Sequence, residues 1–447
     1  MENELKILDE RKEFIICKSS DKKGNVKCDQ ESIAGSVSQR ACVYCGARVV
    51  LNPITDAIHI VHGPIGCASY TWDIRGSLSS GPSFYRNSFS TDLKENDVIF
   101  GGEKKLSQAI DEIVKEFKPK LIFVYSTCIV GIIGDDLDAV CKEAENKYGI
   151  TVIPIQSSGF IGNKSMGYKA ACNALMKIMK TFKKDKEEKV EGINILGDFN
   201  LAGEMWIITK YLKDIGVNII SKFTGDGRFD EIKNASNATL NIVQCAGSMT
   251  FLAREMEKEF NIPYIKVSFV GLEDTKRSLI DIVRHFKDKI EVEKAKEYID
   301  NEIKKVLPSL EMYKDKLKGK KAAIYVGGGF KAISLIRQFR NLGVETVIVG
   351  TQTGKKDEYE VIESITPDGT VILDDTNPTE LEKFIKEKKA DILVGGVKER
   401  PLAYKLGVAF CDHNHERKHP LCGFEGAVNF AQEIDLTVNS PVWKYLR

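Results

Sequence analysis

Short apolar runs alternate with amphipathic stretches along most of the chain. The runs are rich in β-branched and aromatic residues and occupy residues 121–125, 151–155, 193–196, 240–244, 322–326, 346–350 and 391–396. Runs of this length and content predict buried parallel strands. Because the segments between them show helical periodicity, we predict an α/β protein with three Rossmann-like, doubly wound domains and mainly parallel sheets.

Residues 137–148 illustrate the helical pattern. Charged residues occupy most of the remaining positions. The apolar side chains that recur at helical spacing are Leu137, Val140, Cys141, Ala144 and Tyr148. A glycine follows at position 149, where a helix commonly ends. The pattern predicts an amphipathic helix that buries one face and stops at this glycine.

Charged runs interrupt the apolar pattern at residues 183–192 and 314–321 and suggest domain boundaries. We predict an N-terminal extension, three α/β domains and a C-terminal segment with a terminal helix, at 1–37, 38–188, 189–316, 317–410 and 411–447. No repeat of fixed period accompanies this organisation.

Composition narrows the functional classes. A chain of 447 residues, 43% of them hydrophobic, is longer than a domain with a single hydrophobic core usually is, so several domains are expected. Its 65 Lys and Arg residues balance 64 Asp and Glu residues, which argues against a nucleic-acid binder. The charged start "MENELKILDERKEF" has no signal-peptide core, and no window approaches ~20 uninterrupted apolar residues. We therefore expect a cytoplasmic protein without a membrane partner.

The eleven cysteines are the main candidate chemistry. A reducing cytoplasm disfavours disulfides, so metal binding or packing must account for most of them. Cys141 and Cys172 lie on apolar helix faces and are expected to pack. Cys128 and Cys245 instead each follow a predicted strand and precede a glycine-containing turn. That position is the carboxyl edge of a parallel sheet, where ligands bind in open α/β folds.

Two further motifs contain cysteine. "IVHGPIGCASYTWDIRG" places Cys67 between glycines and aromatic residues, and "RACVYCGAR" contains Cys42 and Cys45. The C-x-x-C pair is half a zinc site or a redox motif, but neither pattern is completed nearby. Spacing alone leaves Cys42, Cys67 and Cys128 as either core residues or metal ligands.

Four longer motifs help to choose between packing and metal binding for these cysteines. "RACVYCGARVVLNPITDAIHIVHGPIGCASYTWDIRG", "STCIVGIIGDD", "IVQCAGSMTFLAREME" and "GFEGAVNFAQEIDLTVNSPVW" resemble the nitrogenase component 1 family, from about residue 38 to residue 447. The resemblance implies three Rossmann-like domains. It also implies a [4Fe-4S] cluster at the boundary with a paralogous subunit, with Cys42, Cys67 and Cys128 as its ligands. Cys45 is extra to the family pattern and is expected to pack, with substitution for Cys42 as a cluster ligand as the alternative.

The resemblance also points to a second site. Catalytic subunits of the family hold their molybdenum–iron–sulfur cofactor by one cysteine and one histidine, with a glutamine and a second histidine nearby. Cys245 matches the cysteine, whereas Asn414 stands at the ligand histidine. Lys164 stands near the glutamine, and Tyr168 replaces the second histidine. Because an amide is a poor metal ligand beside an imidazole, these replacements favour a scaffold over a catalytic subunit.

Two cations are candidate partners of bound anions. Arg75 and Lys164 are interpreted as counter-charges for an anionic cluster or for homocitrate. The alternative for each is an ordinary surface ion pair.

The resemblance is strongest to family members on which the iron–molybdenum cofactor is assembled. It implies an α2β2 heterotetramer with a NifN-like subunit and an iron–sulfur–carbon precursor delivered from NifB. Molybdenum and homocitrate would arrive through the Fe protein, and the apo catalytic component would accept the product. A catalytic α-type subunit of a nitrogenase or nitrogenase-like reductase, using His413 or His415 as ligand, is the alternative. A Rossmann enzyme without a cluster is a third class.

Two loops remain ambiguous. "YVGGGFKA" (325–332) joins a predicted strand to a predicted helix, as a tight turn or as a cradle of amides for an anion. His413, His415 and His419 lie in a polar stretch without regular metal-site spacing. We expect these imidazoles to be solvated or hydrogen-bonded, with transient metal binding as the alternative.

Overall fold

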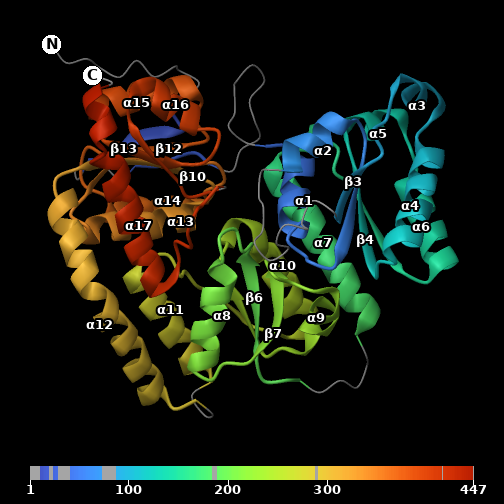
Figure 1. Ribbon diagram of the computed structural model, residues 1–447, viewed down its shortest axis with the longest axis horizontal. Coiled ribbons are helices and arrows are strands. Elements are labelled where there is room, and N and C mark those ends of the chain that lie inside the picture. Colours follow the sequence, from blue (N-terminus) through green and yellow to red (C-terminus); the bar gives the residue numbers. More distant parts are fainter. Residues whose placement is uncertain are drawn as a thin grey trace. The chain divides into compact units, whose positions relative to one another are not determined.

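The computed structural model describes residues 11–19, 24–28, 41–72, 87–183, 189–286, 290–414 and 416–445. They form two compact units. One unit comprises residues 41–267, and the other comprises the described residues before 41 and after 267. Figure 1 shows the helices and strands of both units.

The 41–267 unit holds two parallel four-stranded sheets. The first has the order β3-β2-β4-β5: Ser88–Ser90, Ala57–His62, Leu121–Ser126 and Thr151–Ile155. The second has the order β7-β6-β8-β9: Ile219–Thr224, Ile193–Asp198, Leu240–Val243 and Tyr264–Lys266.

Helices cover these two sheets (Figure 1). Those of the first sheet are α1 Val43–Leu51, α2 Ile65–Trp72, α3 Glu95–Phe100, α4 Glu103–Phe117, α5 Cys128–Ile133, α6 Leu137–Tyr148 and α7 Lys164–Phe182, with the short turn η3 Gly159–Ile161. Those of the second sheet are α8 Glu204–Asp214, α9 Phe229–Asn234 and α10 Ala246–Phe260, with η4 Ala235–Asn237.

Strand β4 shows why its sequence is continuously apolar. Phe123 and Tyr125 belong to the core that contains residues of α1 and α7. Ile122 and Val124 point to the opposite face, in the core formed with α4 and α6. A strand covered by helices on both faces needs apolar residues at every position.

The other unit holds one six-stranded sheet of order β1-β12-β11-β10-β13-β14: Ile15–Cys17, Val371–Asp374, Glu345–Thr351, Lys321–Val326, Ile392–Gly395 and Ala409–Asp412. Strands β10 to β14 are parallel, in the order of a doubly wound fold. Strand β1 pairs antiparallel with β12, with Ile15 opposite Leu373. The N-terminal stretch thus supplies an edge strand to this sheet.

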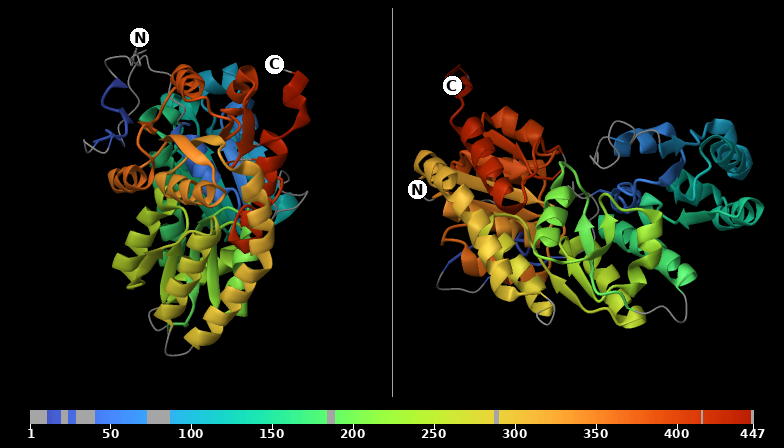
Figure 2. Two further views of the ribbon diagram at one scale, coloured as in Figure 1. Left: turned by 90° about the vertical axis from the view of Figure 1, so that its left-hand side faces the viewer. Right: turned by 60° about the horizontal axis from the view of Figure 1, so that its bottom comes forward.

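The helices of this unit are α11 Leu272–His285, α12 Val292–Leu317, α13 Gly329–Asn341, α14 Lys356–Ile365, α15 Pro378–Lys388, α16 Arg400–Leu406 and α17 Gly423–Val438, followed by η5 Pro441–Tyr445. The long helix α12 runs beside α17 in both views (Figures 1 and 2). An ion pair joins Lys316 Nζ to Asp435 Oδ2 at 3.1 Å across these two helices.

The predicted fold class is confirmed, since all three sheets are parallel apart from β1. Each of the seven predicted strands is present within one or two residues of its expected bounds. Helix α6 spans the predicted residues and ends at Gly149 in the left-handed conformation. The domain boundaries given above stay predictions.

Helices α1 and α7 approach each other closely enough to require glycine. A Cβ at Gly46 would lie 2.2 Å from the Lys164 carbonyl oxygen, and one at Gly167 would lie 2.0 Å from that of Val43. No side chain fits in so little space. This contact fixes the start of α7 against the start of α1.

Candidate functional site

The three candidate cluster cysteines all lie at the beginning of a helix. Cys42 caps α1, Cys67 is the third residue of α2, and Cys128 is the first residue of α5. Helix N-termini carry unpaired N–H groups and partial positive charge, which stabilise a thiolate.

The sheet topology explains why two of these cysteines are neighbours. Cys67 follows β2 and Cys128 follows β4, and these strands are adjacent at the point where the strand order reverses. This switch point is where doubly wound sheets open a crevice for ligands. The predicted position of Cys128 at the carboxyl edge of a sheet is therefore confirmed.

Gly159 lies beside both Cys128 and Cys42, the third candidate ligand. Its N–H donates a hydrogen bond to the Cys128 Sγ at 3.2 Å. A Cβ at Gly159 would lie 3.0 Å from that sulfur and 3.2 Å from the Cys42 Cβ. The absence of a side chain at Gly159 therefore leaves room beside two of the thiols.

The thiols influence one another's ionisation. Burial raises the pKa of Cys42, and the charges of Cys45 and Cys128 raise it further, while the amides of Cys45 and Tyr44 lower it. Burial also raises the pKa of Cys67, and Cys128 and Cys42 add to the rise. Without a cation, Cys42 and Cys67 favour the neutral thiol, because burial and the charges of the neighbouring thiols both raise their pKa.

The donor set suits a cluster better than a single ion. Among the described residues, no three His, Cys, Asp or Glu side chains are arranged to hold one metal ion. An iron–sulfur cluster accepts one thiolate at each of several irons, so its ligands stand further apart. Cys42, Cys67 and Cys128, with the space at Gly159, fit such a group.

A buried His–Asp pair connects the loops that carry Cys67 and Cys128. His62 Nε2 lies 2.9 Å from Asp135 Oδ2, and neither side chain is exposed by more than 3%. His62 ends β2, and Asp135 follows α5. The backbone oxygen of His62 also accepts a hydrogen bond from Thr127 Oγ1 at 3.0 Å. These bonds hold the two cysteine loops in one arrangement.

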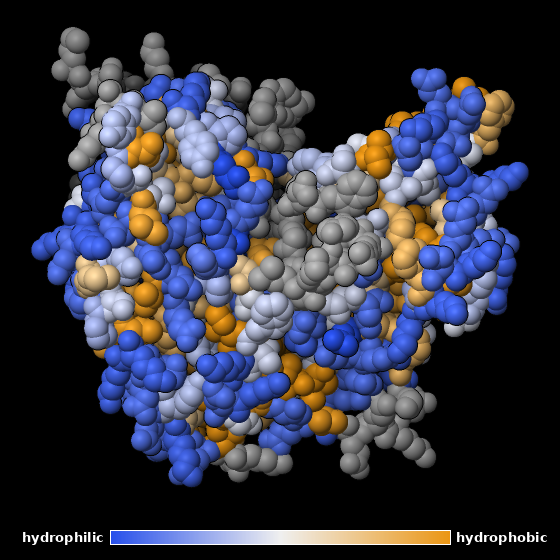
Figure 3. Space-filling model, viewed as in Figure 1, coloured by the Kyte–Doolittle hydropathy of each residue, from blue (hydrophilic) through white to orange (hydrophobic). Residues whose placement is uncertain are grey.

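Exposed apolar side chains surround these loops. They lie on α2, α3, α5, η3 and the first turn of α7: Ile65, Tyr70, Ile99, Phe100, Ile132, Phe160, Ile161 and Met166. Phe100 is 84% exposed and Ile99 is 71% exposed. Apolar colour is visible at the end of the surface that holds α3 (Figure 3). A gathering of large apolar residues on a surface marks an interaction site.

Cys45 lies within the core beside this site. Its side chain is 1% exposed and packs in the core of α1, α7 and β4. This burial agrees with the predicted packing, while the choice of Cys42 over Cys45 as the ligand stays a prediction. The buried side chains of Cys141 and Cys172 likewise confirm their predicted packing role.

Cys245 occupies the switch point of the second sheet. It follows β8, caps α10 and is half-buried. The adjacent strand β6 contains Gly197 with φ +93°, where a Cβ would lie 2.7 Å from the Cys245 Cβ. Glycine is required there both by conformation and by space. The thiol stands at an open sheet edge, as the sequence predicted.

Of the two predicted cationic residues, the structure describes Lys164 and not Arg75. Lys164 begins α7, is 6% exposed and lies with its Nζ 5.8 Å from the Tyr168 ring centroid. The residue before it, Asn163, forms an isolated backbone bridge with Cys42. Lys164 is therefore close in the fold to the start of α1. Arg75 lies outside the described residues.

Asn414 belongs to the other unit and is nearly buried. It follows β14, and its backbone N–H donates to Asp412 Oδ1 at 2.9 Å. Its side chain is 4% exposed. Asn414 lies at the carboxyl edge of the third sheet. Cys128 and Cys245 lie at the corresponding edges of the first and second sheets.

His413 contradicts the expectation of a solvated or hydrogen-bonded imidazole. Its side chain is fully buried, and among the described residues neither ring nitrogen has a hydrogen-bond partner. The backbone N–H of His413 extends the sheet by donating to the Gly395 oxygen, which directs the ring toward Phe430, 5.9 Å away. His419 is exposed as expected, and His415 lies outside the described residues.

The glycine loop at 327–329 is a turn whose amides are partly occupied. Glu358 accepts hydrogen bonds from the Phe330 N–H at 3.1 Å and the Lys355 N–H at 2.9 Å. A Cβ at Gly329 would lie 2.7 Å from the Glu358 Cβ. A carboxylate of the chain itself thus caps α13, as the tight-turn alternative requires.

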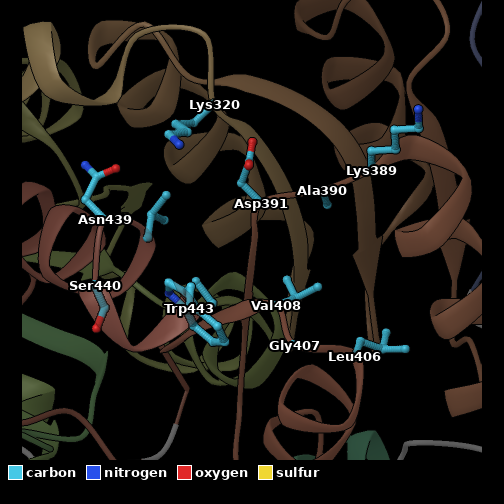
Figure 4. A pocket seen from close by; sticks show the side chains of 12 residues that line it. Lys320, Lys389, Ala390, Asp391, Leu406, Gly407, Val408, Asn439, Ser440 and Trp443 are labelled. Carbon is cyan, nitrogen blue, oxygen red and sulfur yellow. The ribbon is translucent and has the colours of Figure 1, made fainter. Parts of the chain in front are cut away.

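A cavity of about 540 Å³ lies at the amino-terminal edge of the third sheet. Lys320, Asp391, Asn439 and Trp443 line it together with apolar side chains (Figure 4). Its lining contains no cysteine or histidine. This cavity is therefore not a thiolate site.

Three supporting residues escaped sequence reasoning: Gly159, His62 and Asp135. The "HGP" before Cys67 and the "GDD" after Cys128 lie in the quoted motifs, but nothing in their spacing shows that they meet. Pairing of β2 with β4 would have been the necessary signal.

Buried histidines predict acid sensitivity. Burial holds the pKa of His59 and that of His413 well below 6.5. The unfolded chain therefore takes up more protons between the folded pKa and 6.5. Stability from these groups is present above pH 6.5 and is lost below it, by up to about 1.4 kcal/mol per pH unit for each histidine. Urea unfolding at pH 7.5, 6.5 and 5.5 measures this slope.

The free energy of unfolding of the His413→Gln variant should fall less steeply with decreasing pH than that of the wild type. The matched variant His419→Gln should keep the wild-type slope. A free energy of unfolding that stays constant down to pH 5.5 would contradict the assignment of neutral buried imidazoles.

Comparison with known proteins places the chain in a family. The family model "Nitrogenase component 1 type Oxidoreductase" matches residues 42–439, well over half of the chain. The chain belongs to the nitrogenase component 1 family. A solved member, "Nitrogenase Cp1 at pH 5", is similar with a TM-score of 0.89 and 31% identity, over 99% of this chain and 98% of that one.

Family relatives differ in their similarity to the chain. The nitrogenase iron–molybdenum cofactor biosynthesis protein NifE of Clostridium pasteurianum is 69% identical, over 99% of this chain and 97% of the relative. NifE of Methanosarcina barkeri is 53% identical, over 98% and 97%. The nitrogenase molybdenum–iron protein alpha chain of Methanosarcina barkeri is 34% identical, over 99% and 95%. The chain is thus NifE-like within the nitrogenase component 1 family. In the described part, no helix is long and apolar enough to cross a membrane.

Proposed function

We propose that this chain is a scaffold subunit for nitrogenase iron–molybdenum cofactor biosynthesis. On it the iron–sulfur–carbon precursor is held and matured with molybdenum and homocitrate before transfer to the apo catalytic component. The observation that carries this proposal is 69% identity to a NifE over nearly the whole chain, against 34% to a catalytic alpha chain.

The resident cofactor of the proposal is a [4Fe-4S] cluster on Cys42, Cys67 and Cys128. When bound, it would supply one-electron transfer. The Gly159 N–H donates to the Cys128 sulfur and offsets part of its negative charge. The His62–Asp135 pair keeps the ligand loops in register.

The exposed apolar side chains around the cluster loops support a paralogous, NifN-like partner. Such a partner would cover Ile65, Tyr70 and Phe160 and complete an α2β2 heterotetramer. The further partners of the proposal are NifB as source of the precursor and the Fe protein as carrier of molybdenum and homocitrate. The proposed compartment is the cytoplasm.

The precursor is cargo, and in this proposal one strong ligand and one weak ligand hold it. Cys245 offers one thiolate at an open sheet edge, and Asn414 offers an amide where the catalytic subunit has an imidazole. Lys164 and Arg75 would supply positive charge for the anionic cargo. One strong anchor permits release.

A catalytic α-type subunit is the second candidate, and one observation weakens it. It requires His413 or His415 to replace the missing ligand. The His413 ring packs against Phe430 with no exposed surface, so it reaches a cofactor only after repacking of the core.

Transfer of cargo tests the proposal. The loaded complex should activate an apo catalytic component, and Asn414→His should slow the transfer by about 10-fold or more, because a second strong ligand worth at least 1.4 kcal/mol holds the cargo. The measurement is the rate of activation at equal cluster loading.

Asn414→Gln, which keeps an amide, serves as the matched control and should transfer at nearly the wild-type rate. Steady ammonia formation by the purified complex without the catalytic component would overturn the scaffold function. Equal transfer rates for Asn414→His and wild type would overturn the weak-anchor explanation alone.

A further inference from the structure

Arg48 is a buried cation that has no carboxylate partner among the residues that the structure describes. It lies on α1 with 1% of its surface exposed. Its Nη2 donates to Ser88 Oγ at 2.6 Å, while Nε and Nη1 have no hydrogen-bond partner in the described part of the chain. Its Cζ lies 5.4 Å from the Tyr125 ring centroid.

The groups around Arg48 are neutral. Its positive charge adds to burial in lowering the pKa of His59, so that imidazole is uncharged. An isolated buried charge is strongly unfavourable in a protein and is normally paired. The described residues supply aromatic and hydroxyl contacts to Arg48 but no compensating negative charge.

Tyr44, one turn before Arg48 on α1, connects that helix with the segment that carries Cys67. Its hydroxyl is 2.8 Å from Thr71 Oγ1, and Thr71 donates to the Cys67 backbone oxygen at 3.4 Å. The Tyr44 and Tyr125 rings meet edge to face at 5.9 Å between centroids, so Tyr44 contacts the ring beside which Arg48 lies. Arg48 follows Cys42 by six residues on α1, about 9 Å along the helix axis.

We propose that Arg48 is the buried counter-charge of the iron–sulfur cluster on Cys42, Cys67 and Cys128 and that it raises the reduction potential of that cluster. The inference rests on the cluster site of the proposed function. A cluster held by thiolates is anionic, and one-electron reduction adds a further negative charge. A fixed cation in surroundings of low dielectric stabilises the reduced form more than the oxidised form.

The same placement explains why an unpaired arginine is tolerated. In the cluster-free protein its charge is unfavourable, and cluster binding relieves that penalty. Cluster binding should therefore stabilise the wild-type protein more than a variant without the charge.

The experiment compares Arg48→Met, which removes the charge, with Arg48→Lys, which keeps it. In the purified complex, EPR-monitored redox titration should give a lower midpoint potential for Arg48→Met and a value near wild type for Arg48→Lys. In the cluster-free protein, Arg48→Met should melt at the wild-type temperature or above it. Arg48→Gln, a polar neutral side chain, repeats the titration if methionine disturbs the packing.

Arg11 provides a matched control. It is also buried, at 6% exposure, but it pairs with Glu380 at 3.0 Å in the unit that lacks the cluster cysteines. Arg11→Met should lower the melting temperature and leave the potential unchanged.

An unchanged potential in Arg48→Met and Arg48→Gln, with the cluster fully loaded, would overturn the inference and leave the proposed function intact. An equal fall in Arg48→Lys would also overturn it, because charge would not be the cause. A wild-type complex without a cluster on these cysteines would instead overturn the site on which the inference rests.

Discussion

Cys128→Ala is expected to remove the brown, oxygen-sensitive iron–sulfur absorbance of the purified complex. Cys128 is the ligand that Gly159 supports with a hydrogen bond, and its loss leaves two thiols of the three. Removing groups that merely support a metal ligand already costs about 10- to 100-fold in affinity, and removing a ligand should cost more. Iron content and absorbance after anaerobic purification measure the loss. Partner binding should weaken as well.

Cys67→Ala should behave in the same way, whereas the packed Cys141 supplies the matched control. Cys141→Ala removes a buried thiol of the same unit and should retain the cluster. Undiminished iron in both ligand variants would refute the site. If Cys45→Ala lost more iron than Cys42→Ala, the roles of these two neighbours would be exchanged.

Cys245→Ala is expected to lose the cargo and keep the resident cluster. Cys245 stands at the edge of the second sheet, and the other three cysteines are carried by elements of the first. Because a single thiolate is the strong anchor in the proposal, its removal should lower precursor occupancy by about 10-fold or more. Separate EPR signals and metal counts for the two clusters report the outcome.

Cys172→Ala is the control for a disturbance of α10. Its sulfur lies 3.5 Å from the Ser248 oxygen in the first turn of that helix, so the variant alters the support of α10 without removing the edge thiol. Loss of both clusters in Cys245→Ala would show a general folding defect. Wild-type precursor occupancy would refute the role of Cys245.

Strand β4 was predictable because its apolar run is buried on both faces, whereas β2 was missed because two histidines interrupt its apolar run. β4 reads "LIFVYS" and was found, while β2 reads "AIHIVH" and was not. Its two histidines are buried because His59 bonds the Tyr125 hydroxyl at 2.9 Å and His62 bonds Asp135. Neither partner is near in sequence, so local pattern could not show that a histidine belongs in the core.

The candidate site was predictable only in part, for a similar reason. Cys128 and Cys245 could be placed at sheet edges because each follows a recognisable strand. The meeting of Cys42 with Cys128 depends on Gly159 and on the close packing of α1 against α7, which no spacing records. The error at His413 arose because its flanking residues are polar, whereas the sheet continues one residue further and turns the ring inward.

The edge strand β1 imposes an order on synthesis. Residues 41–267 form contacts among themselves and can fold while later residues are still being made. Ile15 must wait for its partner Leu373, which at about 5–20 residues per second emerges on the order of tens of seconds later. The first of the described strands to leave the ribosome is therefore among the last to pair, and its apolar side chains stay accessible to chaperones and to neighbouring chains during most of translation.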